Sequence, residues 1–300
     1  MANSPVITTL TNYIQQERLP LISKAVLGAK SIKMFSKQTG IKTSAAINLL
    51  TTDVQFQDGK VCGFQDAGTQ ELSQRVLTTG VIKVNLEYCK NKMLDKWMQY
   101  EISIKVGDER LPFEQEFVED VNKDIQAKLE KAVWQGDTTS GDENLKWFDG
   151  LLKIATNDVS VNKVTITGTS AYDDIMAVYA AIPEQVLDKA VIFVGADVYR
   201  KFGTELVNKN LFHYDGAYSN GEVYIPGTST RVVKVNGLNG TDKIFAADPN
   251  RVYFGCDMVD DSEEYDFWYS KDNDSYRLNV RFNAGVQYPF SNEVVLGAKA

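Results

Sequence analysis

The chain has 300 residues, of which 43% are hydrophobic and 24% are charged. These values are typical of a globular protein with one large domain or a few interleaved subdomains, and they exclude disordered, collagen-like and low-complexity classes. The formal net charge of −8 argues against a sequence-specific DNA binder, which usually carries a basic face, but not against a protein that encloses DNA. No apolar run is long enough to predict a membrane span, and no signal peptide is visible, so we expect a cytoplasmic protein.

The N-terminal third alternates between helical and extended patterns. Residues 5–35 carry apolar side chains at roughly helical spacing, which predicts two short amphipathic helices with a break near Pro20. Residues 54–90 favour an extended conformation, with a tight turn at Asp58-Gly59. Residues 92–104 predict a short helix.

The tip of the extended segment, from Gly68 to Arg75, is polar, and Leu72 is its only apolar residue. A hairpin this long and this polar buries little of its own surface. It needs another surface to lie on. We expect that surface to belong to another copy of the same chain.

The clearest element is a helix predicted over residues 112–135, which Pro112 opens and Gly136 closes. Acidic residues lead and basic residues trail along the helix, which suits its macrodipole. Its apolar residues recur at a strict spacing of four, and the stripe they form favours packing against a long curved sheet. These residues are Phe113, Phe117, Val121, Ile125, Leu129 and Val133.

Helices and strands interleave in the rest of the chain. Residues 158–168 and 190–194 predict strands, and residues 172–182 and 197–207 predict helices, which together form a helix–strand–helix layer. Near the C-terminus, residues 276–283 alternate between apolar and polar side chains, as in a long strand with one polar face. The class is therefore α+β with non-sequential subdomains.

Residues that would support catalysis or metal binding are sparse. The sequence lacks the nucleophile pattern GxSxG and the phosphate-binding patterns GxGxxG and GxxxxGK[ST], and its one histidine, His213, lies in a predicted loop. Clustered cysteine and histidine ligands for zinc are absent. We therefore predict no catalytic residue, no cofactor and no metal site. The three cysteines are expected to be reduced structural thiols; they are Cys62, Cys89 and Cys256.

Two other clusters leave alternatives open. The acidic residues between Asp257 and Glu264, and the pair Asp272 and Asp274, do not match the EF-hand spacing. They favour solvated loops, with a weak divalent-ion site between subunits as the alternative. The aromatic residues between Tyr265 and Tyr269 favour core or interface packing over base stacking, because no arginine or lysine is interleaved with them.

The order of these elements resembles the major capsid proteins of tailed bacteriophages with the Hong Kong 97-type fold. The resemblance covers about residues 54–295. The amino-acid sequence around KLEKAVWQGD and FDGLLK is similar to that of capsid proteins from phages of Bacteroidetes hosts, including crAss-like phages. The segments that carry it are QRVLT in the hairpin, FEQEFVEDVNKDIQAKLEKAVWQGD, WFDGLL, AVIFVGADVYRKF and NVRFNAGVQYPF.

The resemblance implies a division of the chain. It implies an N-terminal arm over residues 1–53, an extended loop over 54–92 and a peripheral domain over 93–171 that contains the spine helix 112–135. It further implies an axial domain over 172–240 and return strands of the peripheral domain over 241–300. Too few residues precede the hairpin for a long scaffolding segment, so we expect a separate scaffolding protein or none.

The implied function is assembly. Pentamers and hexamers would form an icosahedral shell around double-stranded DNA, in a virion assembled in the bacterial cytoplasm. Expected partners are the chain itself, a portal protein, scaffolding or decoration proteins, and packaged DNA contacted without sequence specificity; no membrane is involved. Arg75 is expected to pair with a neighbour's carboxylate, with Glu119 or Asp120 of the spine helix as the candidates. The expected loop contacts are Gln70, Glu71, Leu72, Gln74 and Arg75.

Two alternatives remain open at this stage. The first is an encapsulin-type cellular compartment, a shell of the same fold with a cargo enzyme inside. The second is a soluble α/β enzyme with an acidic site around residues 257–264.

Overall fold

The computed structural model describes residues 14, 18–60, 62–63, 68–89, 95–96, 98, 113–211, 222–257 and 264–299. Most of the helix predicted over 92–104, and His213, lie outside these residues. The helices are α2 (Arg18–Leu27), α3 (Lys30–Met34), α5 (Phe113–Gln135), α6 (Leu151–Asn157), α7 (Ala171–Ala180) and α8 (Ala196–Asn208). The strands are β1 (Ser36–Gln38), β2 (Ser44–Val54), β3 (Gly68–Thr78), β4 (Gly80–Cys89), β5 (Asn162–Ile166), β6 (Val191–Val194), β7 (Glu222–Tyr224), β8 (Arg231–Lys234), β9 (Ile244–Ala247), β10 (Tyr253–Gly255), β11 (Glu264–Ser270), β12 (Ser275–Gln287) and β13 (Val295–Lys299).

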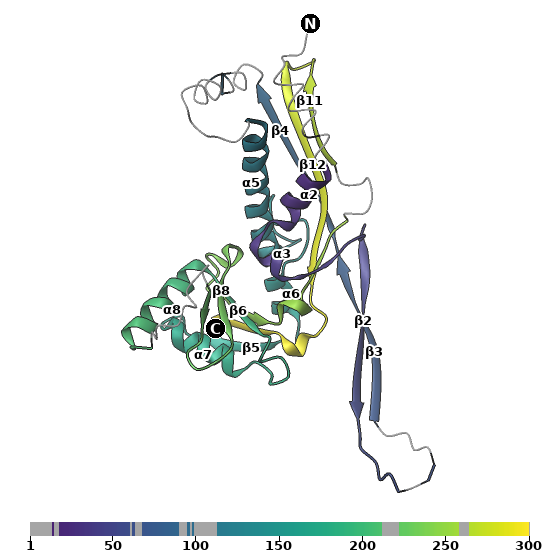
Figure 1. Cartoon of the computed structure of the whole chain (residues 1–300), viewed down its shortest axis with the longest axis vertical. Helices are drawn as coiled ribbons and strands as arrows, with labels where there is room; N and C mark the ends of the chain where they lie inside the picture. The colour runs from purple at the N-terminus through teal and green to yellow at the C-terminus, as the bar shows by residue number, and fades with distance from the viewer. Residues whose placement is uncertain are drawn as a thin grey trace.

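Strand β12 is the centre of the first sheet, which runs along the long axis of the molecule (Figure 1). It pairs antiparallel with β4 and β11 and, at its C-terminal end, with β10, which in turn pairs with β1. The predicted apolar side of β12 is confirmed, because Tyr276, Leu278, Val280 and Phe282 are buried. The other side is less open than its polar sequence predicts, since Asn279 and Asn283 are also buried.

Helix α5 lies beside this sheet and confirms the predicted spine helix (Figure 1). Four of the six stripe residues are buried and Phe117 is partly buried, where its ring meets Tyr88 of β4 and Phe267 of β11 edge-on. Burial of these apolar side chains stabilises the helix, because the hydrophobic effect favours removing them from water. The buried four are Val121, Ile125, Leu129 and Val133.

Helices α2 and α3 confirm that the N-terminal segment forms short helices, and α2 begins at Arg18, close to the break predicted near Pro20. Pro20 is the third residue of α2. Proline is tolerated in the first helical turn, because that turn's N–H groups have no intrahelical partner. A break that the sequence analysis did not predict falls at Gly28 and Ala29, and α3 begins at Lys30.

The second sheet has six strands in the order β5-β13-β9-β6-β8-β7, and α7 and α8 pack on it. This confirms the predicted helix–strand–helix layer, although the sheet also includes β13 from the end of the chain. Trp134, at the end of α5, joins the two halves of the fold. Its fully buried ring packs against Phe193 of β6 and Phe245 of β9, with centroids 5.2 Å and 5.3 Å away.

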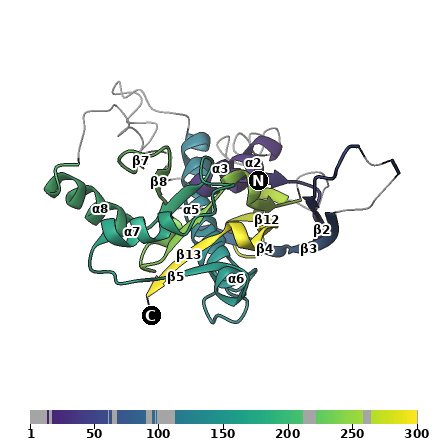
Figure 2. The same cartoon turned by 90° about the horizontal axis from the view of Figure 1, so that it is seen from below.

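Strands β2 and β3 form a separate two-stranded sheet that projects from the rest of the molecule in both views (Figure 1, Figure 2). The hairpin begins at Ser44 rather than at residue 54, so its first strand comes from the segment expected to be the N-terminal arm. Asp58 and Gly59 lie in the connection, beyond the end of β2. Strand β4 continues directly from β3 but leaves the hairpin and pairs with β12.

Candidate assembly surface

The outer face of the β2–β3 hairpin is exposed along its whole length and carries no charged residue. Strict pairing from Ser44↔Thr78 to Val54↔Gly68 places alternate residues of both strands on one side. Every residue on that side is exposed. We call this side the open face; it consists of Ser44, Ala46, Asn48, Leu50, Thr52, Val54, Gly68, Gln70, Leu72, Gln74, Val76 and Thr78.

Apolar side chains lie opposite one another on the open face. Leu50 and Leu72 are a directly opposed cross-strand pair, 62% and 72% exposed, and Val76 and Val54 add further exposed apolar surface. A water-exposed leucine pair of this kind costs free energy, because fully burying one leucine side chain is worth about 1.5–3 kcal/mol. Uncharged polar pairs, Asn48 with Gln74 and Thr52 with Gln70, flank the leucine pair, so the open face mixes apolar and polar surface as protein interfaces do.

The opposite side of the hairpin, the body face, is tied to the chain's own body near its base. Ile47 and Leu77 are buried there in a small cluster with Ile41, against which Tyr253 of β10 packs. The backbone also contributes, since Thr79 N–H donates to Thr43 O over 2.9 Å and the Gln287 amide donates to Val76 O over 3.1 Å. These contacts fix the base of the hairpin to the body.

Arg75 is the main polar anchor on the body face. Its guanidinium makes an ion pair of 2.5 Å with Asp158, donates to the Ser291 hydroxyl and lies 4.7 Å from the centre of the Tyr288 ring. Burial alone would raise the pKa of Asp158, but the hydrogen bonds from Arg75 and Ser291 outweigh it and lower the pKa to about 2. Burial raises the pKa of the Tyr288 phenol, which keeps the ring neutral beneath the cation.

The five predicted loop contacts are divided between the two faces. Gln70, Leu72 and Gln74 lie on the open face, whereas Glu71 and Arg75 lie on the body face. The partner expected for Arg75 was a neighbour's carboxylate, but the structure gives its side chain a partner in the same chain, Asp158. The two candidate partners on α5 are also engaged within the chain: Glu119 pairs with Lys24 at 2.9 Å and Asp120 pairs with Lys123 at 3.5 Å.

Sequence reasoning missed the exposed position of Leu50 on the open face and the extent of β2. Leu50 lies opposite Leu72 because β2 pairs with β3. The extended segment was predicted to start at residue 54, so the prediction left out most of β2. The signal was present in the sequence, because residues 45–50 read AAINLL, a short apolar run next to a polar stretch.

Neither a protein-family model nor a curated protein matches the chain. Solved structures match over its whole length. A chain of the satellite phage P4 procapsid that includes the size determination (Sid) protein has a TM-score of 0.63 at 15% identity, covering 100% of this chain and 92% of that one. A chain of Microbacterium phage Oxtober96 has a TM-score of 0.57 at 14% identity, covering 91% of both chains. The chain has the Hong Kong 97-type capsid fold.

A third match shows how widely the fold is distributed. The virus-like particle from Pyrococcus furiosus has a TM-score of 0.51 at 10% identity, covering 93% of this chain and 97% of that one. In the Hong Kong 97-type fold of this chain, α5 is the spine helix and the β2–β3 hairpin is the extended loop. These matches do not show the more specific resemblance to phages of Bacteroidetes hosts, which stays a prediction.

The structure describes the other candidate sites only in part. No group of three or more histidine, cysteine, aspartate or glutamate side chains within the described residues is arranged to hold a metal ion. Of the acidic cluster, residues 258–263 lie outside the described residues, as does His213. Tyr265 and Phe267 are buried in the core, as predicted, while Trp268 is 43% exposed. Of the helices that the structure describes, none has the length and apolar character needed to cross a bilayer.

Proposed function

We propose that this chain is the subunit of a closed protein shell, and that the open face of its hairpin rests on a second copy. The observation that carries the proposal is the open face itself: twelve exposed, uncharged positions on a hairpin that projects from the body. The capsid fold supports the same function, because the solved structures that share it are phage and virus-like particles.

A second copy is the occupant that the physics favours. A two-stranded sheet by itself is only marginally stable in water, and both edges of this hairpin are unpaired among the described strands. The mixed surface of leucine, valine, asparagine and glutamine on the open face is typical of protein interfaces, which combine apolar contacts with hydrogen bonds. Repeated over a symmetric shell, many such contacts add up to a stable container.

We propose a finer assignment as well, which the capsid fold supports. In the proposed particle, pentamers and hexamers tile an icosahedral shell around double-stranded DNA in a virion assembled in the bacterial cytoplasm. Residues 172–240 form the axial domain at the symmetry axes, and residues before the hairpin form the N-terminal arm. A portal protein and scaffolding or decoration proteins are the proposed partners. The chain acts by assembly and not by catalysis.

The test is assembly of hairpin variants. Replacing Leu50 and Leu72 together by lysine places two charges on the open face, where their burial against a neighbour would be unfavourable. Because both side chains are exposed in the subunit, its fold is expected to persist. Negative-stain imaging and sedimentation are expected to show closed shells for the wild type and only capsomers or smaller species for the variant.

A matched control uses the same hairpin. Thr69 and Ser73 lie on the body face near the tip and are exposed, so replacing both by lysine adds the same charge on the other side. This control is expected to form shells. Normal shells from the Leu50→Lys, Leu72→Lys variant would contradict the proposal that the open face makes the contact.

An encapsulin-type compartment is the second candidate, and the match to the Pyrococcus furiosus virus-like particle favours keeping it. The two differ in what the shell contains. Particles purified from their natural source are expected to contain DNA; particles that contain a cargo enzyme instead would decide for the compartment.

A further inference from the structure

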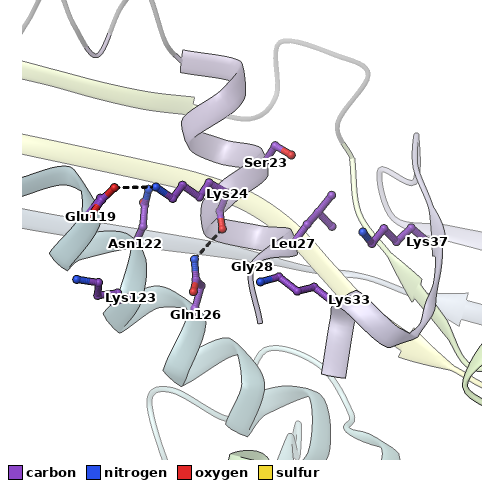
Figure 3. Close-up of a pocket in the computed structure, with 10 residues that line it drawn as sticks. All are labelled: Ser23, Lys24, Leu27, Gly28, Lys33, Lys37, Glu119, Asn122, Lys123 and Gln126. Carbon is purple, nitrogen blue, oxygen red and sulfur yellow. Dashed lines mark hydrogen bonds and ion pairs between the residues drawn. The ribbon is translucent and has the colours of Figure 1, made fainter. Parts of the chain in front are cut away.

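A basic pocket lies between the N-terminal helices and the spine helix (Figure 3). Its volume is about 450 Å³. Elements far apart in the sequence build it: α2 and α3 on one side, β1 at one end and α5 on the other. Its charged lining residues are Lys24, Lys33, Lys37, Lys123 and Glu119.

The charge of this pocket is opposite to that of the chain. Four lysines and one glutamate line it, whereas the chain as a whole has a net charge of −8. Lys24 pairs with Glu119 and Lys123 pairs with Asp120. Lys33 and Lys37 are exposed and have no acidic partner among the described residues, so their charges are available to an anion.

The walls of the pocket are fixed rather than loosely apposed. The Gln126 amide donates a 2.8 Å hydrogen bond to Lys24 O in the last turn of α2. This bond occupies a carbonyl whose negative end would otherwise repel an anion. Gly28 permits the approach, because a Cβ atom there would lie only 2.2 Å from Gln126 Nε2.

A buried donor at the same site also points to an acceptor ligand. Asn122 is 1% exposed and lines the pocket. Its Oδ1 accepts from the Tyr265 hydroxyl over 3.3 Å, while its Nδ2 donates to none of the described residues. A buried amide N–H without a partner is unfavourable by about 1–3 kcal/mol in general, so such a group favours binding an oxygen acceptor.

We propose that this pocket binds phosphodiester groups. Leu27 is its only large apolar lining residue, which disfavours a protein segment that needs apolar anchors, whereas lysine and amide donors suit phosphate oxygens. This inference rests on the proposed function for the identity of the ligand: in a shell that encloses double-stranded DNA, the phosphates are those of the enclosed DNA. The rest of the acidic chain repels that DNA, and the pocket holds it at one point per subunit.

The test compares two double variants that change the net charge equally. Lys33→Glu with Lys37→Glu reverses the two available charges of the pocket. Lys131→Glu with Lys189→Glu changes two exposed lysines that do not line it. Binding of short duplex DNA to purified subunits is measured against salt concentration. We expect the pocket variant to bind about tenfold more weakly or worse at about 50 mM salt, with a salt slope smaller by about 1–2, and the control to bind as the wild type does.

The remaining measurements distinguish a failure of the DNA-binding inference from a failure of the shell proposal. The pocket variant is expected to form shells like the wild type, so a loss of DNA binding with shells intact leaves the shell proposal unaffected. If the pocket variant does not fold, Lys33→Gln with Lys37→Gln replaces it in the same titration. Equal DNA affinity and salt slope in the pocket variant, the control and the wild type would overturn the inference. So would tighter binding of inorganic phosphate alone, or of poly-glutamate, than of duplex DNA.

Discussion

Arg75 and Asp158 lie 83 residues apart in the sequence, and their contact ties the hairpin to the body. The guanidinium is 23% exposed and the carboxylate 13% exposed, so water screens the pair only in part. An ion pair of this kind costs desolvation but is unfavourable to break, because the remaining charge loses its partner. At the residue scale, this polar contact therefore adds to the apolar cluster of Ile47 and Leu77 in holding the hairpin to the body.

The first prediction concerns the pH dependence of this anchor. Arg75→Met is expected to lower the free energy of unfolding by about 2 kcal/mol near pH 7. Because the pKa of Asp158 lies at about 2 in the folded chain, below its ordinary value of 3.8, the pair stabilises the fold above pH 4 and loses its effect as the pH falls toward 2. Denaturant unfolding at several pH values measures this difference.

An exposed pair provides the control for that prediction. Arg200 and Asp197 on α8 are 78% and 68% exposed and 3.4 Å apart, so Arg200→Met is expected to change the free energy of unfolding by less than about 0.5 kcal/mol at any pH. A difference between wild type and Arg75→Met that stays constant from neutral pH to below pH 3 would show that Asp158 is not the group responsible.

Gly136 and Gly150 allow two backbone segments to lie in close contact after the spine helix. The two backbones meet, with Gly150 N–H donating to Gly136 O over 2.9 Å. Lys153 then joins Asp137 and Asp149, each at 2.7 Å. The hydrogen bond from Lys153 is the main cause that lowers the pKa of Asp137 to about 2. These contacts close the loop that follows α5.

The second prediction tests this close approach. A Cβ atom at Gly150 would lie 2.6 Å from Gly136 N and 2.8 Å from Ala132 O, and backbone atoms cannot move aside cheaply. Gly150→Ala is therefore expected to destabilise the chain by about 2–3 kcal/mol in thermal unfolding. Gly141→Ala, where nothing lies within 4 Å, is the matched control and is expected to be neutral. Equal melting temperatures for the two variants would refute the packing argument.

At the scale of elements, α5 is the one that sequence reasoning predicts best. Its spacing of four, its opening proline and its closing glycine placed its ends within one residue of those observed. One side of the helix is buried against both halves of the fold. Its apolar positions therefore coincide with its buried side, and their spacing predicts the helix.

The third prediction follows from that burial. Leu129 is 3% exposed, and Leu129→Ala is expected to lower the free energy of unfolding by about 2–5 kcal/mol, through lost apolar burial and the cavity left behind. The neighbouring Lys128, whose side chain is 56% exposed, is the control, and Lys128→Ala is expected to cost less than about 0.5 kcal/mol. Chemical denaturation measures both. A small effect of Leu129→Ala would mean that α5 does not pack as described.

The hairpin is the element that sequence reasoning located least well. The pattern of burial fixes a strand's boundaries only when one of its faces is buried, and most of β2 and β3 is exposed on both sides. The apolar run at residues 45–50 is therefore only a weak signal for a strand that starts at Ser44, and the opposition of Leu50 and Leu72 follows only from the pairing of the two strands. The polar tip itself is predictable, because a segment with Leu72 as its only apolar residue stands out whatever its pairing.

At the scale of the whole molecule, the order of elements predicted the fold class, while the contacts between distant segments could not be predicted. The second sheet takes strands from residues 162–166, 191–194 and 295–299, and no local pattern reveals such neighbours. The basic pocket has the same origin: each of its lysines, taken alone, is an ordinary surface residue. Only the packing of α2 and α3 on α5 brings them together.

The most direct test of the shell proposal is electron cryomicroscopy of the assembled protein. The predicted result is a closed particle in which a neighbouring subunit covers the open face of every hairpin, so that Leu50 and Leu72, now 62% and 72% exposed, become buried. A protein that stays monomeric at high concentration, or a particle in which the open face remains in contact with solvent, would contradict the proposal.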